Sequence, residues 1–344
     1  KNYEEGTPRD NNFAIGGDAK IGVTPGLNLD LTVNPDFSQV EVDRQQTNIS
    51  RFELFFPEKR QFFLENNDLF SNFGGRESKP FFSRRIGITL DTATGQNIQN
   101  TIYAGMRLSG KLDKNWRIGL LNMQAAPDDK NGLPSYNYGM AVLQRKIFSN
   151  STVSAFMVNK EAAFNDKEKA YDIGLDHYNR VLGSEFNYRS INGKFSISAF
   201  YHRSFNELDT LDKEFSSGLE VNYRTRKYSI FSLYREVGND YTAEVGFVPR
   251  VNFKKSFTRG QYNFYPVGNA ISSHGFSLEY EHTWNNEHSK TDQFASVGYE
   301  INFANLSRLS VETTFDYTYL LDDFDPARVN NDLFLKAGTN YTYS

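Results

Sequence analysis

Apolar and polar side chains alternate along most of the chain after about residue 100. In "HGFSLEYEHTW" (274–284) the alternation places Phe276 and Leu278 on one face and Glu279 and Glu281 on the other. The segments "TIYAGMRLSG" and "RLSVETTFDYTYL" repeat this pattern. A two-residue period predicts β-strands. The alternating segments are roughly 10–13 residues long, about twice the mean strand of globular proteins and close to the ~9–11 residues that cross a bilayer at a tilt.

The connections between these segments also alternate in length. Short turns are expected near "KLDKN" (111–115), "FSN" (148–150) and "ING" (191–193), and longer polar connections lie between them. Outer-membrane barrels have this asymmetry, whereas a Greek-key sandwich has no reason for it. The pattern therefore predicts an all-β fold, an antiparallel transmembrane β-barrel of about 14–18 strands that continues beyond residue 344. One strand is expected over residues 82–90. The expected strand over 241–265 is too long and should break near Pro249.

The alternation stops between residues 35 and 81. This divides the chain into N-terminal barrel strands (1–34), a plug-like aromatic and charged insert (35–81) and a barrel body of up-and-down hairpins (82–344). The insert contains "RFELFFPEKRQFFLE" at residues 51–65. The i, i+3, i+4 spacing of its first three phenylalanines predicts a helical turn that Thr47 or Asn48 could cap. The expected aromatic core of the insert is Phe52, Phe55, Phe56, Phe62 and Phe63.

Specific segments of the chain resemble a known family. The stretch "LTVNPDFSQVEVDRQQTNISRFELFFPEKRQFFLENNDLF" (31–70), "PFFSRRIGI" (80–88) and "GFVPRVNF" (246–253) are similar to a Bacteroidota outer-membrane barrel family of unknown function, the C-terminal domain found fused to a family-9-like carbohydrate-binding domain. The resemblance implies a bacterial outer-membrane location and a preceding carbohydrate-binding-like domain that is absent from this chain. It implies no reaction, because the activity of the family is not established.

Composition narrows the classes of protein that remain. The 344 residues have a formal net charge of −4, so no basic footprint indicates a nucleic-acid partner. The absence of cysteine excludes disulfides and thiolate metal sites. Thirty Phe and 20 Tyr suit pleated surfaces. The mean hydropathy of −0.60 is compatible with a membrane barrel, because only alternate strand residues meet lipid.

The position of the insert allows two interpretations. A barrel of about sixteen strands leaves an aqueous lumen unless something fills it, and the insert is the segment suited to fold inward as a plug. The alternative is a cap or loop knot that packs on the rim of the barrel. Under both, most residues of the insert serve packing.

The densest cluster of charged side chains lies in and beside the insert. The candidate plug and lumen residues are Glu41, Asp43, Arg44, Arg51, Glu53, Glu58, Lys59, Arg60, Glu65, Arg84 and Arg85. They could form a polar constriction that selects solutes, since rings of charge do so in pores. Alternatively, they form ion pairs that fasten the insert to inward-facing charges such as Arg107, Glu185, Arg189, Glu220, Arg224 and Glu312.

Candidate chemistry outside this cluster is weak. His274 and His282 fall on the apolar face of their strand, which favours a membrane-interface belt, and His202 should point inward. The spacing supports no catalytic set around His202, which needs a nucleophile and an orienting group within hydrogen-bond reach. We therefore expect no catalytic residue, cofactor or metal site.

The sequence thus predicts a non-enzymatic outer-membrane β-barrel, either a plugged channel or a subunit of a larger cell-envelope complex for transport or assembly. The alternatives are a solute-conducting porin for oligosaccharide or peptide, a barrel-embedded hydrolase, and a soluble carbohydrate-binding β-protein. The expected partners are outer-membrane lipid and other envelope proteins.

Overall fold

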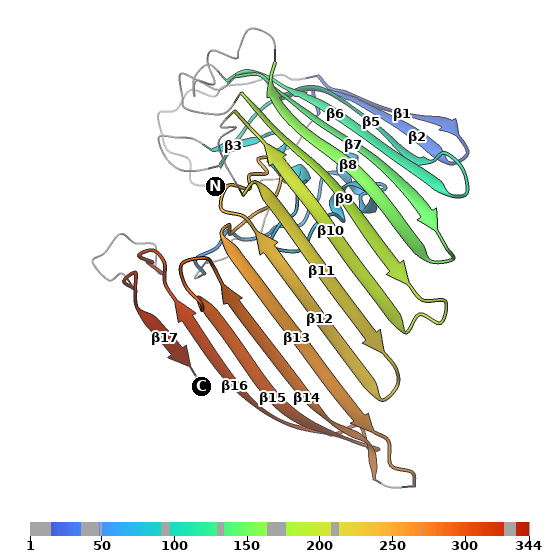
Figure 1. Cartoon of the computed structure of the whole chain (residues 1–344). Coiled ribbons are helices and arrows are strands. Elements are labelled where there is room, and N and C mark those ends of the chain that lie inside the picture. Colours follow the sequence, from blue (N-terminus) through green and yellow to red (C-terminus); the bar gives the residue numbers. More distant parts are fainter. Residues whose placement is uncertain are drawn as a thin grey trace, which may run out of the picture.

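The computed structural model describes residues 15–35, 48, 50–90, 97–128, 134–163, 177–207, 213–268, 270–326 and 335–343. Fifteen strands form one antiparallel sheet, in which the strands follow one another in chain order. Figure 1 shows this sheet as a curved shell, with short helices on its concave side. The fold is therefore all-β, as the two-residue periodicity predicts.

The strands of the main sheet are mostly 10–14 residues long. They are β1 Gly17–Thr24, β2 Leu27–Val33, β5 Ile102–Lys111, β6 Trp116–Ala125, β7 Tyr136–Ile147, β8 Ser151–Ala162, β9 Tyr178–Arg189, β10 Phe195–Phe205, β11 Phe215–Arg224, β12 Tyr228–Val237, β13 Phe253–Phe264, β14 Ile271–Trp284, β15 Asp292–Phe303, β16 Arg308–Tyr319 and β17 Asn340–Tyr343. The remaining elements are α1 Gln61–Leu64, α2 Asp68–Ser71, the 3-10 helix η2 Ser83–Arg85, and β3 Ile88–Leu90 with β4 Asn97–Gln99, which form a separate two-stranded sheet.

The sheet is not closed into the barrel that the sequence predicts. Among the described strands, β1 pairs only with β2 and β17 pairs only with β16, so these two strands are the open edges. Twist accumulated over successive strands curves the shell. Edge hydrogen bonds are needed to close such a shell, and the described residues make none between β1 and β17.

One of the two expected strands differs from the prediction and the other agrees with it. Residues 82–90 add no strand to the main sheet, because η2 occupies residues 83–85 and Gly87 has a φ of 78°. The long segment 241–265 is broken, as expected from Pro249: β13 begins at Phe253 and the preceding residues form a loop.

The alternation of side chains is the strongest correct prediction. On β14, Phe276 and Leu278 are more than half exposed on the convex face, whereas Thr283 is only 3% exposed on the concave face. A β-bulge produces one exception, because the register of β5 shifts between Ile102 and Ala104. Ile102 is consequently buried, although its sequence parity places it with the exposed Met106.

Candidate functional site

Residues 50–86 form the insert as the structure describes it, and within it residues 65–77 cross the concave face of the sheet in the order of the strands. The backbone carbonyl of Glu65 accepts a hydrogen bond from Arg107 of β5, and Asp68 pairs with Arg117 of β6. Farther along, Gly74 donates its backbone N–H to Glu185 of β9. A single short segment therefore connects strands that are far apart in the sheet.

The centre of this contact is apolar. Leu69, Phe70 and Phe73 are at most 4% exposed and belong to one cluster with inward side chains of β6–β9. The ring of Phe73 lies 4.4 Å from that of Phe156 on β8. At Gly119 of β6 an added Cβ would lie 2.9 Å from the Phe70 ring. The concave face of β6 is thus complementary to the insert at this point, because only glycine at position 119 leaves room for Phe70.

A buried arginine holds the insert together internally. Arg60 is 3% exposed and donates to the carbonyl oxygens of Ile86, at 2.7 Å, and Ser83, at 2.6 Å. It also pairs with Glu58 at 2.8 Å, and its guanidinium lies 4.4 Å from the Phe63 ring. Burial would raise the pKa of Glu58, but the hydrogen bonds and charge of Arg60 and the Ser83 hydroxyl outweigh it and lower that pKa.

Residues 245–247, far from the insert in sequence, pack against it through backbone hydrogen bonds. Lys79 and Phe247 exchange backbone hydrogen bonds of 3.0 and 2.9 Å, and Phe82 donates to the carbonyl of Val245 at 2.7 Å. An added Cβ at Gly246 would lie 2.3 Å from the Lys79 carbonyl oxygen. The segments "PFFSRRIGI" and "GFVPRVNF", which carry the family resemblance, are therefore neighbours in space.

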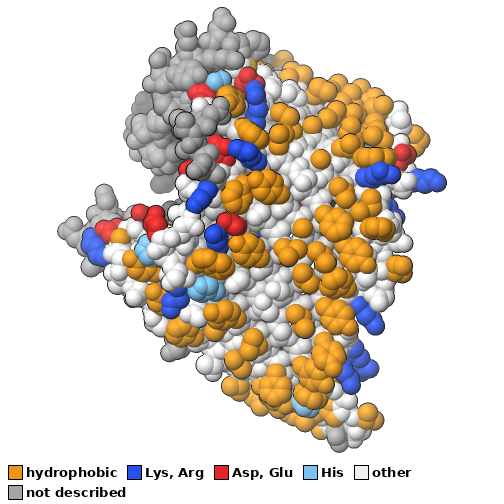
Figure 2. Space-filling model, viewed as in Figure 1, with side chains coloured by type: hydrophobic (Ala, Val, Ile, Leu, Met, Phe, Trp, Pro, Cys, Tyr) orange, Lys and Arg blue, Asp and Glu red, His pale blue; other side chains and the backbone are white. Residues whose placement is uncertain are grey.

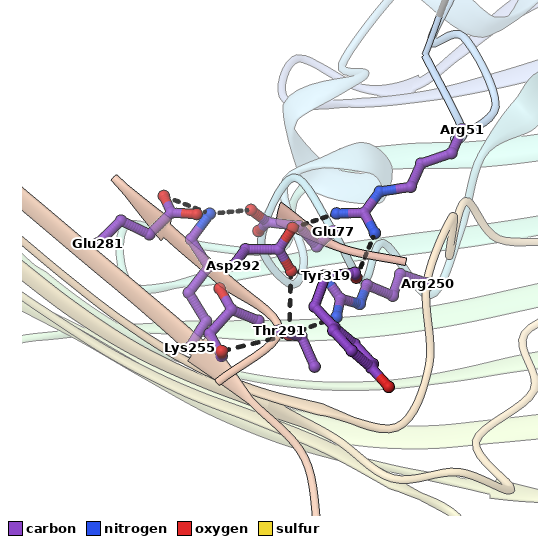
Figure 3. Close-up of polar contacts among 9 residues, drawn as sticks. Arg51, Glu77, Arg250, Lys255, Glu281, Thr291, Asp292 and Tyr319 are labelled. Atoms are coloured by element: carbon purple, nitrogen blue, oxygen red, sulfur yellow. Dashed lines mark hydrogen bonds and ion pairs between the residues drawn. The ribbon is translucent and has the colours of Figure 1, made fainter. Parts of the chain in front are cut away.

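Arg51 and Glu77 of the insert contact a network of charges that includes side chains of β13, β14 and β15 (Figure 3). Asp292 pairs with both Arg51 and Arg250, and Arg250 also donates to the Thr291 hydroxyl at 2.8 Å. Lys255 lies between Glu77, at 3.1 Å, and Glu281, at 2.8 Å. Of these side chains, Glu77, Arg250, Lys255, Glu281 and Asp292 line a cavity of about 560 Å3 together with apolar ones such as Phe52, Phe55, Phe247, Pro249 and Phe253. Two of its three cations, Arg250 and Lys255, are therefore neutralised by carboxylates of the same cavity.

The structure places the predicted site residues in several environments. Glu41, Asp43 and Arg44 lie outside the described residues, as does Thr47. Arg85 pairs with Glu53, and Arg84 donates to the Pro57 carbonyl at 3.0 Å and lies over the Phe56 ring. Glu65 pairs with Lys20 of β1, and the Lys59 backbone N–H donates to Glu58.

The aromatic residues of the insert do not gather into one core. Phe63 is buried in the central cluster and Phe62 packs against it, whereas Phe55 is 41% exposed and stacks near Phe82 and Phe247. The expected helical turn over Phe52–Phe56 is wrong, since residues 53–60 form no helix and the α-helices are α1 and α2. Pro57 prevents a helix from continuing there, and Asn48 instead accepts a hydrogen bond from the Ser50 N–H.

Sequence reasoning missed the partners of the insert on β13 and β15. Of the inward charges considered, Arg107 and Glu185 contact the insert, whereas Glu220 pairs with Arg235 and Glu312 accepts a hydrogen bond from Ser296. Asp292 and Lys255 carried no local signal. The family resemblance of residues 246–253 was the one available indication that this region meets the insert.

His202 lies inward, as predicted, and is 0% exposed. Its Nε2 is 3.3 Å from Glu185, and Ser216 lies opposite on β11 and is also completely buried. A substrate cannot reach these side chains while the insert covers them. In the described part of the chain, no group of three His, Asp or Glu side chains could hold a metal ion, and no helix is long and apolar enough to span a membrane.

These features define a class: a large antiparallel β-sheet shell with a compact insert seated on its concave face. The chain belongs to the family described as a domain of unknown function (DUF5916), whose model matches residues 1–343. No curated protein and no solved structure matches the chain.

Proposed function

We propose that the chain is a non-enzymatic outer-membrane β-barrel protein whose insert is a plug in the lumen. The observation that supports this most is the apolar convex face, which Figure 2 shows spread across the strands, with charged side chains at its margins. A soluble protein rarely exposes a contiguous apolar patch larger than a few hundred Å2. The exposed side chains include Leu120, Leu143, Val153, Met157, Leu182, Phe186, Leu219, Ile230, Phe276, Leu278, Val297, Leu309 and Val311.

Aromatic contacts on this face form two bands. Near the short turns, Tyr228 contacts Tyr262 and Phe276 contacts Tyr299, with ring centroids 5.0 and 4.7 Å apart. Near the long connections, Trp284 stacks with His282 at 5.2 Å. Phe276 and Trp284 are eight residues apart, roughly 27 Å along the strand, or about 19–22 Å along the membrane normal at a strand tilt of 35–45°. Outer-membrane barrels have an apolar band ~25 Å tall between two aromatic girdles, so this spacing supports a membrane location.

Lipid contact can be tested with single cysteines, because the chain has none. Leu278→Cys and Glu279→Cys are labelled with a polarity-sensitive fluorophore and reconstituted into vesicles containing lipids brominated on the acyl chains. We expect quenching at position 278 and little at 279. Equal quenching at the two positions, or purification of the protein as a monodisperse particle without detergent, would contradict the proposal.

Charge on the convex face should destabilise the protein in the membrane. Val311→Lys should cost about 2–4 kcal/mol if position 311 meets the bilayer near its midplane. The neighbouring Glu312→Gln, on the concave face, is the matched control and should be tolerated. Heat-modifiable mobility after assembly in vesicles measures the folded fraction, and equal tolerance of the two changes would remove the lipid-facing assignment.

The plug is the part of the proposal that concerns transport. Its support is the continuous contact of residues 65–77 with strands from β5 to β13. A plugged channel predicts little conductance in planar bilayers for the intact chain and increased conductance after deletion of residues 47–79. Unchanged conductance after the deletion, with the strand content preserved by circular dichroism, argues against a plug.

A subunit of a larger envelope complex is the second candidate function. The observation that favours it is the pair of open edges at β1 and β17, since unpaired strand groups cannot face lipid. This candidate predicts no ion conductance in planar bilayers and stable co-purification with other envelope proteins. A Bacteroidota source and an attached carbohydrate-binding domain, implied by the sequence resemblance, belong to the same proposal.

A further inference from the structure

The short-turn end of β5–β12 is strongly basic on its concave side. Two hollows of about 510 and 410 Å3 lie there, between the strand ends and the turns, and they share Asn150 and Arg189. Their linings contain seven cations and a single carboxylate, Asp113. The cations are Lys111, Lys114, Arg117, Lys146, Arg189, Lys194 and Arg224.

Almost none of this positive charge is neutralised. Among the residues that the structure describes, Arg117 has the one ion pair of the group, with Asp68 at 2.7 Å. Asp113 uses one oxygen to accept the backbone N–H groups of Asn115 and Trp116, at 2.6 and 2.8 Å, and so holds its own turn. Both hollows therefore carry an excess of positive charge, because six of the seven cations have no ion pair with a described residue.

The strand register places like charges opposite each other. Lys111 of β5 lies directly across from Arg117 of β6. Arg224 donates its backbone N–H to the carbonyl of Lys194 at 2.8 Å, so this second pair of cations is also opposed. Like charges directly opposite on neighbouring strands are destabilising. Asp68 already pairs with Arg117, so an anion would chiefly relieve the repulsion between Lys194 and Arg224.

The cavity beneath the insert is the instructive contrast. Three cations line it: Arg250 pairs with Asp292 and Lys255 lies between Glu77 and Glu281, whereas Arg76 has no ion pair with a described residue. Turn positions 304–307, at the same end of the sheet, are flanked by Arg308, which pairs with Glu300. Among the described residues, six of the seven cations at β5–β12 thus lack an ion pair, against one of three in that cavity.

We propose that the two basic hollows at the short-turn end of β5–β12 bind a multiply charged anion of the phosphate class. Rings of Arg and Lys select anions and phosphates in pores, and a cleft lined by one sign of charge raises the local concentration of counter-ions. The amide groups of Gln144 and Asn150 and the hydroxyls of Ser149 and Ser151 lie in the same lining and can donate further hydrogen bonds. The phosphate groups can belong to a soluble ion or to a lipid headgroup.

Isothermal titration of the detergent-solubilised full chain tests the proposal with two probes. Sodium tripolyphosphate represents the soluble source, and dihexanoyl phosphatidic acid represents the headgroup. We expect saturable binding of at least one probe, weakened by salt and weakened roughly tenfold or more in the double variant Lys146→Gln/Arg189→Gln. The probe that binds more tightly assigns the source.

Two control variants make the test specific. Arg308→Gln removes a cation that is paired with Glu300 at the same end of the sheet and should leave the affinity unchanged. Lys146→Arg/Arg189→Lys keeps the charges and should retain binding, which separates loss of charge from misfolding. Absence of saturable binding for both probes, or equal affinity in the wild type and the charge-deleted variant, would overturn the proposal. Binding in detergent does not require a bilayer, so this outcome is independent of the lipid-quenching experiment.

Discussion

The two parts of the concave face differ in what covers them. In the middle of β6, β7 and β8, inward side chains are buried in one cluster with the insert and include Met123, Val142 and Val158, each at most 3% exposed. On β16 the inward positions Glu312, Thr314 and Asp316 are exposed. The same alternating strand pattern therefore gives two kinds of inward face. The face beneath the insert excludes water (the dry wall), and the face without the insert is exposed to solvent (the wet wall). The position of the insert is therefore visible in the type of inward residue, apolar beneath the insert and polar elsewhere, and not in the strand pattern.

The largest effect should come from the arginine inside the insert. Arg60→Ala leaves the Glu58 carboxylate and two carbonyl oxygens buried without their partner, and we expect a cost of about 3–5 kcal/mol. Arg308→Ala, which removes an exposed pair on the wet wall, should cost at most about 1 kcal/mol. Limited proteolysis of residues 50–86 in the assembled protein measures the difference.

Matched polar substitutions test the dry and wet walls directly. Val158→Asn buries an amide without a partner and should cost about 3 kcal/mol, whereas Thr314→Asn should change little, because its side chain is solvated. Urea titration in detergent gives both values. Similar costs at the two positions would mean that the coverage seen in Figure 1 does not persist in solution.

A smaller effect should follow from filling the space left for Phe70. Gly119→Ala places a Cβ 2.9 Å from that ring and should destabilise the seated insert by about 1–3 kcal/mol. Gly260→Ala on β13 is the control, since an added Cβ there meets nothing within 4 Å. If the insert is equally protected from protease in the two variants, Phe70 is not seated against the wall.

The smallest effect should be a pH dependence of the insert. The pKa of Glu58 is lowered in the folded chain, so its contribution is present above its ordinary value of 4.5 and is lost as the pH falls through the lowered value. Protease protection of the insert should therefore decrease in acid. Glu58→Gln should flatten this part of the profile relative to the wild type, and identical profiles would show that Glu58 does not contribute.

The strands could be predicted from sequence because alternation is a local property of a pleated chain. The parity of Leu278 and Glu279 follows from spacing alone, and the one misplaced residue, Ile102, lies at a bulge that spacing cannot show. The path of the insert could not be predicted, because Asp292 and Lys255 are separated from it by more than half the chain. Closure was over-predicted, since alternation is the same in an open and in a closed sheet.

The exchange of backbone hydrogen bonds between Lys79 and Phe247 has a kinetic consequence. Contacts between residues so distant in sequence form slowly, because a long loop must close before they contribute. The insert precedes β5 in the chain, whereas its partner segment around Phe247 follows β12. We therefore expect seating of the insert to be a late event of assembly, after the hairpins from β5 to β12 are in place.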